Sequence, residues 1–260
     1  MSKYVSILRP LYRFPYALLS VVKRKFLKYF LAKPKKYNEI INQINKKGFA
    51  DCTELFSQVC HSDLKKIEQR IERKVKPKIE KSFLRFLNFH LDYELPKTFL
   101  DLSQEISENF FKHKFVRLES TQYQISLSNT DDLPGMGYHI DDYGGILKFY
   151  VFFHRMDENN GPFRILTKSK NFMSFFKGFV WLWLTKLNST YFESSKIDKD
   201  ILDSEEKIYC DDFSIFAIDT SFLHSSSKIM KGERRVMVLI FRDYLLDLNK
   251  KKCSTEFITG

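Results

Sequence analysis

The chain has 260 residues, of which 43% are hydrophobic and 29% charged, so it is long enough to bury a core and does not have a disordered composition. Its net charge of +11 comes from one end, because residues 1–38 contain ten Lys or Arg and no acid, while the other 33 basic residues and all 32 acids lie beyond them. The nearly neutral body disfavours a nucleic-acid-binding domain, and the lack of any run of 18 apolar residues disfavours a membrane span.

Residues 1–38 have the pattern of a basic amphipathic arm. Prolines flank its centre, and the apolar residues between them fall mostly on one side of a helix, namely Leu18, Leu19, Val22, Phe26, Tyr29 and Phe30. Two interpretations stay open. Either the helix lies on an anionic membrane surface, in which case the protein touches the membrane peripherally, or it packs on the domain with its lysines in water.

Residues 39–260 are predicted to form a single domain whose first part, 39–115, is helical. Apolar residues recur there at helical spacing, and charges of both signs alternate between positions 65 and 81, as on a solvated helix face. The four cysteines of the whole chain, Cys52, Cys60, Cys210 and Cys253, match no zinc-binding spacing. A domain of this size needs no disulfide framework, so we expect reduced thiols in a cytoplasmic protein.

The second part of the domain, 116–245, is predicted to be mainly β. Short alternating or apolar runs separated by Gly, Pro and Asn turn signals predict strands at 117–128, 146–154, 213–219 and 236–241. Several short strands with regular turns are typical of a sandwich or barrel. An aromatic, helix-like insert at 168–207, which contains Trp181 and Trp183, interrupts the pattern.

A His-x-Asp pair lies in the first half of this β region. Side chains two apart on a strand share a face, so His139 and Asp141 are expected to project together. Four of the nine glycines surround the pair, at positions 135, 137, 144 and 145, where they permit tight turns and close approach of a ligand. The pair His90 and Asp92 has the same spacing but lies in helix-like sequence, where the two side chains would diverge.

A second histidine and an arginine follow much later in the chain. His224 comes after the predicted strand at 213–219, and Arg235 opens the strand at 236–241. Two His and one carboxylate on one face of a metal leave open positions, as in non-haem iron(II) oxygenases. Arg235 supplies the fork of donors that the distal carboxylate of a dianionic co-substrate needs.

Four segments together resemble the phytanoyl-CoA dioxygenase family of iron(II)- and 2-oxoglutarate-dependent oxygenases. They read YHIDD, DENNGPFRILTKS, DFSIFAIDTSFLHSS and GERRVMVLIFR, and the resemblance covers roughly residues 117–243. It implies a double-stranded β-helix, a jelly roll of the cupin type, with N-terminal helices and a helical insert. It also implies that iron(II) is bound by His139, Asp141 and His224, and that 2-oxoglutarate is bound by Arg235, Ser226 and Gln124.

The resemblance implies an enzyme that uses dioxygen to hydroxylate a small organic or lipid-like substrate. Asp141 argues against halogenation, because halogenating relatives lack this carboxylate. The chain departs from the family after its Asn-Gly-Pro turn, where Thr167 to Lys170 replace a phrase containing His, so the substrate stays open. Which of the adjacent Arg234 and Arg235 faces inward also stays open. The alternative is a non-catalytic β-helix module attached to a membrane through residues 1–38.

Overall fold

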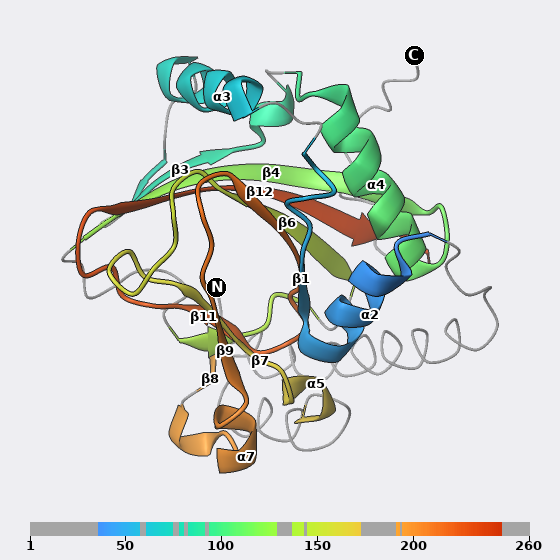
Figure 1. Ribbon diagram of the computed structural model, residues 1–260, viewed down its shortest axis with the longest axis vertical. Helices are drawn as coiled ribbons and strands as arrows, with labels where there is room; N and C mark the ends of the chain where they lie inside the picture. Colours follow the sequence, from blue (N-terminus) through green and yellow to red (C-terminus); the bar gives the residue numbers. More distant parts are fainter. Residues whose placement is uncertain are drawn as a thin grey trace, which may run out of the picture.

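The computed structural model is shown in Figure 1. It describes residues 36–57, 61–74, 78–80, 83–91, 94–128, 137–142, 145–172, 191–192 and 194–245. The predicted arm lies outside these ranges except for its last three residues, and so do Trp181 and Trp183 of the insert. The predictions made for the arm and for the two tryptophans therefore stay predictions.

Two antiparallel sheets face each other across the middle of the molecule (Figure 1). The major sheet has the order β1 (Phe49–Asp51), β10 (Ser214–Asp219), β6 (Ile146–Phe152), β12 (Glu233–Asp243), β4 (Val116–Leu127), β3 (Phe83–Leu87) and β2 (Lys78–Glu80). The minor sheet has the order β8 (Tyr191–Phe192), β5 (Tyr138–His139), β11 (His224–Ser226), β7 (Phe163–Leu166) and β9 (Glu205–Ile208). This arrangement is the double-stranded β-helix that was predicted, and the four predicted strands correspond to β4, β6, β10 and β12.

Helices cover the outer face of the major sheet (Figure 1). The longer helices are α2 (Asn38–Lys47), α3 (His61–Lys74) and α4 (Lys97–Phe111), and the short helix η1 (Phe89–Leu91) lies between α3 and α4 in the chain. The other short helices, α5 (Ser169–Phe172), η2 (Ser194–Lys196) and α7 (Lys199–Leu202), belong to the part of the chain beside the minor sheet (Figure 1). Apolar residues of α3 and α4, such as Leu64 and Phe99, pack with sheet residues such as Phe149 in one buried cluster. Burial of this kind, at about 25 cal/mol per Å² of apolar surface, is the main term that holds the helices on the sheet.

Alternate side chains of β12 enter two different cores. Met237, Leu239 and Phe241 join the cluster under the helices. Val236, Val238 and Ile240 join the cluster between the two sheets. The period of two along a strand therefore sends even-numbered residues of β12 inward, toward the minor sheet, and odd-numbered ones outward.

Two parts of the predicted organisation need correction. Residues 39–115 contain the predicted helices but also β1, β2 and β3, which extend the major sheet at both edges. The insert at 168–207 contains β8 and most of β9, which form the two edges of the minor sheet. These strands have two to five residues. So few residues give almost no periodicity, and neighbouring strands rather than local sequence hold them in the sheet.

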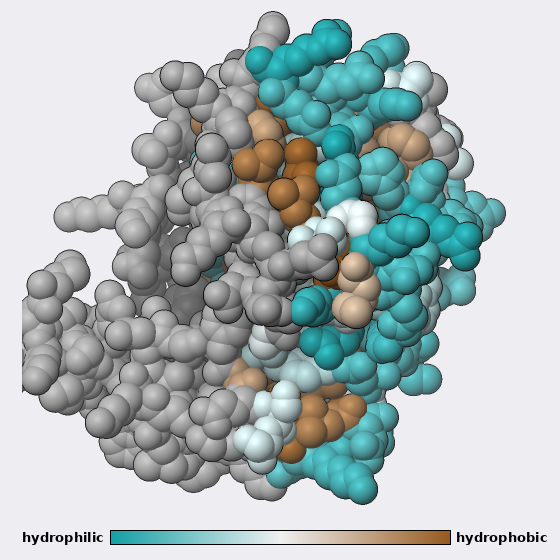
Figure 2. All heavy atoms as spheres, turned by 90° about the vertical axis from the view of Figure 1, so that its left-hand side faces the viewer, coloured by the Kyte–Doolittle hydropathy of each residue, from teal (hydrophilic) through white to brown (hydrophobic). Residues whose placement is uncertain are grey.

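The described helices, surface and cysteines add three observations. Within the described ranges, no helix combines the length and apolar character needed to cross a membrane. The side of the molecule at the left of Figure 1 is mainly hydrophilic where it is described, with apolar groups in separate patches (Figure 2). Of the four cysteines, the described Cys52 and Cys210 are free thiols.

Candidate metal centre

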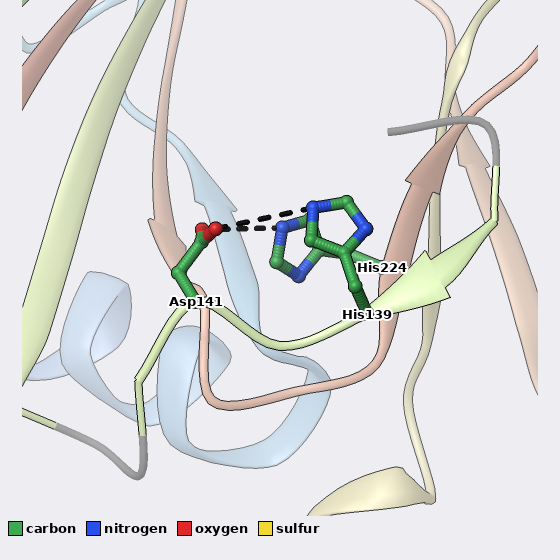
Figure 3. A group of neighbouring side chains, drawn as sticks. All are labelled: His139, Asp141 and His224. Carbon is green, nitrogen blue, oxygen red and sulfur yellow. Dashed lines mark ion pairs between the residues drawn. The ribbon is translucent and has the colours of Figure 1, made fainter. Parts of the chain in front are cut away.

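Pairing in the minor sheet brings the two predicted histidines together. His139 on β5 and His224 on β11 are directly opposed in the antiparallel ladder, and their ring centroids are 4.3 Å apart. Asp141 comes just after β5, which ends at His139, and its backbone N–H donates to the carbonyl of Thr220 at 3.1 Å. The carboxylate of Asp141 points toward both rings (Figure 3).

The spacing of the three side chains fits a single divalent ion. Asp141 Oδ2 lies 3.3 Å from Nε2 of His224, and Asp141 Oδ1 lies 3.9 Å from Nε2 of His139. Ligands at right angles on an ion with bonds of roughly 2.1 Å are roughly 3.0 Å apart, so small movements would suffice. Among the described residues, no other group of three His, Cys, Asp or Glu has metal-binding spacing. Three ligands on one face leave positions for other groups.

Hydrogen bonds prepare both histidines as ligands. Nδ1 of His139 lies 2.9 Å from the carbonyl oxygen of Gly137, and Nδ1 of His224 lies 2.9 Å from that of Phe222. A carbonyl only accepts, so each Nδ1 carries the proton and each Nε2 presents its lone pair to the cluster. Such partners are typical of metal-binding histidines because they set both the tautomer and the ring orientation.

Burial and local charges keep His139 and Asp141 in the protonation states that suit metal ligands. Burial, and then the neighbouring His224, lower the pKa of His139 to about 4, so its ring is neutral at pH 7. Burial by itself would raise the pKa of Asp141, but the ammonium of Lys148 and the ring of His224 outweigh it and hold that pKa well below its usual range. His139 therefore contributes a neutral imidazole and Asp141 an ionised carboxylate.

The cluster lies at a cavity of about 300 Å³ between the two sheets. Aromatic and aliphatic residues form part of its wall, and Phe163 stacks on the ring of His224 with centroids 5.3 Å apart. Besides the cluster, its polar lining is made up of Arg85, Gln122, Gln124, Lys148, Tyr150, Ser226 and Arg234. Of the residues predicted to bind the co-substrate, Ser226 and Gln124 are thus in the cavity wall, and Gln124 donates to Ser126 Oγ at 2.8 Å.

The structure places Arg234, and not the predicted Arg235, in the wall of the cavity. Arg234 is 5% exposed, and its Nη1 donates to the carbonyl oxygens of Gly161 and Ser227. Burial lowers its pKa to about 10, which still leaves the guanidinium charged at pH 7. The expectation followed the spacing of 11 residues from His224, whereas the alternation of β12 places Arg234 on the side of Val236.

Arg235 instead joins a network on the outer face of the sheet. Its Nε donates to Glu233 Oε1 at 2.5 Å, and its Nη1 lies 2.9 Å from Glu72 Oε1 and 3.4 Å from Glu68 Oε1. The hydroxyl of the buried Tyr123 lies within 2.8 Å of both α3 carboxylates. Arg235 therefore links α3 to the sheet.

Four polar cavity residues carry no prediction from the sequence, namely Arg85, Gln122, Lys148 and Tyr150. A signal for two of them is present, because Lys148 is the only charged residue in the otherwise apolar run 146–153 and Tyr150 is two residues further on. A charge in the middle of a buried strand is seldom retained without a partner or a ligand. Arg85 lies on β3, a strand that the sequence does not predict.

Comparisons with known proteins support the fold. No protein-family model and no curated protein matches the sequence. The epimerase SnoN, solved with Fe3+, alpha ketoglutarate and nogalamycin RO, has a TM-score of 0.58 and 10% identity, over 79% of this chain and 82% of that one. HygX from Streptomyces hygroscopicus, solved with nickel, 2-oxoglutarate and hygromycin B, has a TM-score of 0.52 and 11% identity, over 80% of this chain and 88% of that one. AviO1 from Streptomyces viridochromogenes Tue57 has a TM-score of 0.53 and 14% identity, over 83% of this chain and 97% of that one. The chain therefore shares the fold of these proteins.

Proposed function

We propose that the protein is an iron(II)- and 2-oxoglutarate-dependent dioxygenase that hydroxylates a small organic or lipid-like substrate. The observation that carries the proposal is the convergence of His139, Asp141 and His224 at a cavity that also holds the buried guanidinium of Arg234. A facial set of two His and one carboxylate is typical of non-haem iron(II) oxygenases. SnoN and HygX, which share this fold, were solved with iron or nickel and with 2-oxoglutarate, which supports the same ligands here.

The proposed metal ligands are Nε2 of His139, Nε2 of His224 and a carboxylate oxygen of Asp141. When bound, iron(II) would supply the activation of dioxygen that couples the decarboxylation of 2-oxoglutarate to oxidation of the substrate. The chain contributes the orientation of both rings through the carbonyls of Gly137 and Phe222. It also contributes a cavity wall with Phe163 against His224, which limits the access of water to one side of the site.

We propose that Arg234, and not Arg235, binds the distal carboxylate of 2-oxoglutarate. The backbone carbonyls of Gly161 and Ser227 hold one nitrogen of its guanidinium, which leaves other donors for a carboxylate. Tyr150 and Ser226 line the same cavity and offer hydroxyl groups. A fork of donors beside two hydroxyls is well suited to a carboxylate.

The substrate class rests on two supports. The motifs shared with phytanoyl-CoA dioxygenases favour hydroxylation of an organic molecule, and the complexes of HygX with hygromycin B and of SnoN with nogalamycin RO show that this fold accommodates small molecules. SnoN is an epimerase, so the fold alone does not choose the outcome. Mass spectrometry of metabolite and lipid extracts treated with the enzyme, iron(II), 2-oxoglutarate and air should show a product that has gained one oxygen atom, whereas epimerisation would leave the mass unchanged.

The metal assignment is tested without a substrate. Anaerobic addition of iron(II) and then 2-oxoglutarate should produce the visible charge-transfer band of a chelated keto acid, and His139→Ala should abolish it. His154→Ala is the matched control, because His154 is exposed and lies outside the cluster. If the wild-type protein shows no band, or if His139→Ala retains it, the proposed function is wrong.

A further inference from the structure

Lys148 places an ammonium group in the wall of the cavity. It lies in β6 between β10 and β12, opposite Ile218 and Ile240, and its side chain is only 13% exposed. The residues next to it, Leu147 and Phe149, face the opposite core. The sheet on both sides of β6 holds the stem of Lys148 in place, so its charge is directed at the cavity.

The ammonium contacts the carboxylate proposed as a metal ligand. Lys148 Nζ donates to Asp141 Oδ2 at 2.8 Å, and the same oxygen lies 3.3 Å from Nε2 of His224. A metal ion between the two histidines and Asp141 would share this carboxylate with Lys148. Metal and ammonium would then be close neighbours with charges of the same sign, in a partly buried site where charges are poorly screened.

The other charges of the cavity do not offset this repulsion. Among the described side chains that line it, Arg85, Lys148 and Arg234 are cationic and Asp141 is the only carboxylate. A divalent ion alone would therefore add to an existing excess of positive charge. A dianion such as 2-oxoglutarate would offset two positive charges at once, so the second ligand should favour the first.

We propose that Lys148 couples the two ligands of the site: its ammonium weakens the binding of the metal ion alone, and the dianionic co-substrate removes that repulsion. The inference rests on the proposed function and assigns a role to a residue outside the metal-binding motif. By linkage, the factor by which 2-oxoglutarate tightens metal binding equals the factor by which metal tightens 2-oxoglutarate binding.

A simpler role for Lys148 predicts the opposite result. If the ammonium only holds Asp141 in position, its removal leaves a less ordered ligand, and metal binds more weakly with and without 2-oxoglutarate. If Lys148 acts through its charge, its removal strengthens the binding of metal alone. The sign of one measured change therefore separates coupling from positioning.

The experiment measures the affinity for Mn(II), a stand-in for iron(II) that does not support turnover, from the paramagnetic resonance signal of free Mn(II). Wild type, Lys148→Met and Lys148→Arg are titrated with and without saturating 2-oxoglutarate. We expect Lys148→Met to bind Mn(II) alone about tenfold more tightly than wild type, and the tightening by 2-oxoglutarate to shrink about tenfold. Lys148→Arg keeps the charge and should retain most of the coupling. Lys207→Met removes an exposed lysine that pairs with Glu158 and should behave as wild type.

Each other outcome has a defined meaning. Weaker Mn(II) binding by Lys148→Met in both titrations, or unchanged binding in both, would overturn the coupling role. Failure of the wild-type protein to bind Mn(II) or 2-oxoglutarate at all would instead overturn the proposed function. Lys148→Gln, which keeps a polar side chain without the charge, repeats the test if the circular dichroism of Lys148→Met shows loss of structure.

Discussion

The two faces of the major sheet handle charge differently, although alternate residues of the same strands supply both. On the outer face, Arg235 is matched by Glu68, Glu72 and Glu233. On the inner face, Arg234 is more deeply buried, and within the described residues no carboxylate pairs with it. Burying a charge without an opposite charge is unfavourable, and the lowered pKa of Arg234 reflects that.

The contrast distinguishes charged groups that stabilise the fold from charged groups that are available to bind a ligand. The outer network is complete within the chain, so it stabilises the attachment of α3 whether or not a ligand is present. Among the described residues, the cations of the inner face outnumber the carboxylates, and a bound anion would neutralise this excess. Such an imbalance of charge is typical of functional sites. We therefore expect outer-face substitutions to change stability and inner-face substitutions to change ligand affinity.

The largest effect is expected from the apolar centre of the outer face. Phe149 is fully buried and makes edge-to-face contacts with Phe56 and Phe241, at centroid distances of 6.0 and 5.6 Å. Phe149→Ala should lower the free energy of unfolding by about 3–5 kcal/mol, because it removes buried apolar surface and leaves a cavity. Urea denaturation followed by circular dichroism measures this loss. A loss below about 1 kcal/mol would contradict the assignment of this face to the core.

The next effect concerns the inner arginine. Arg234→Met should weaken 2-oxoglutarate binding by about 1.5–3 kcal/mol, or roughly 10- to 150-fold, because a buried charge-assisted hydrogen bond is lost. The free energy of unfolding of the Arg234→Met variant should be unchanged or higher, since a buried charge is removed. Titration of the anaerobic iron(II) protein, read from the charge-transfer band, gives the affinity. Arg235→Met is the matched control, and an equal loss in that variant would show that the two faces are not distinct.

Arg235→Met should show the reverse pattern. It removes the cation beside Glu68, which is 7% exposed, and beside the more exposed Glu72. Because Arg235 and Glu72 are partly open to water, we expect a loss of only about 1–2 kcal/mol in the free energy of unfolding. The same denaturation experiment checks it, with 2-oxoglutarate affinity as the second readout. Unchanged stability would mean that the network does not fasten α3 to the sheet.

The sequence predicts the main strands and the grouping of His139, Asp141 and His224, for a physical reason in each case. Strands β4, β6, β10 and β12 have 6 to 12 residues, which is enough for apolar or alternating patterns to emerge. The positions of His139 and Asp141 follow from a local spacing of two residues. His224 has no such local pattern. It is found because a metal site of this type needs a second imidazole, which must come from a strand far along the chain.

What the sequence misses depends on tertiary context. Strands β1, β2, β3, β8 and β9 exist because a neighbouring strand pairs with them, and Arg85 becomes a cavity residue only through β3. The choice between Arg234 and Arg235 also depends on tertiary context, because odd and even members of the apolar run 236–241 face different cores. Both faces of this strand are apolar, so its sequence alone does not say which face is toward His139, Asp141 and His224.

The smallest effects are expected from the neutral groups of the inner face. Ser226 is two residues after His224 on β11, so both side chains project to the same side, and both line the cavity. Ser226→Ala should weaken 2-oxoglutarate binding about two- to tenfold, the usual contribution of one neutral hydrogen bond. Gln124→Ala should have a smaller effect, because its amide already donates to Ser126.

These two variants sharpen the comparison between the faces, since neither removes a charge. Both affinities are measured by the charge-transfer titration used for Arg234→Met. If Ser226→Ala reduces affinity as strongly as Arg234→Met does, the hydroxyl and not the cation dominates recognition of the carboxylate. In that case the surplus positive charge of the inner face would serve another anion, and the assignment of Arg234 to 2-oxoglutarate would fail.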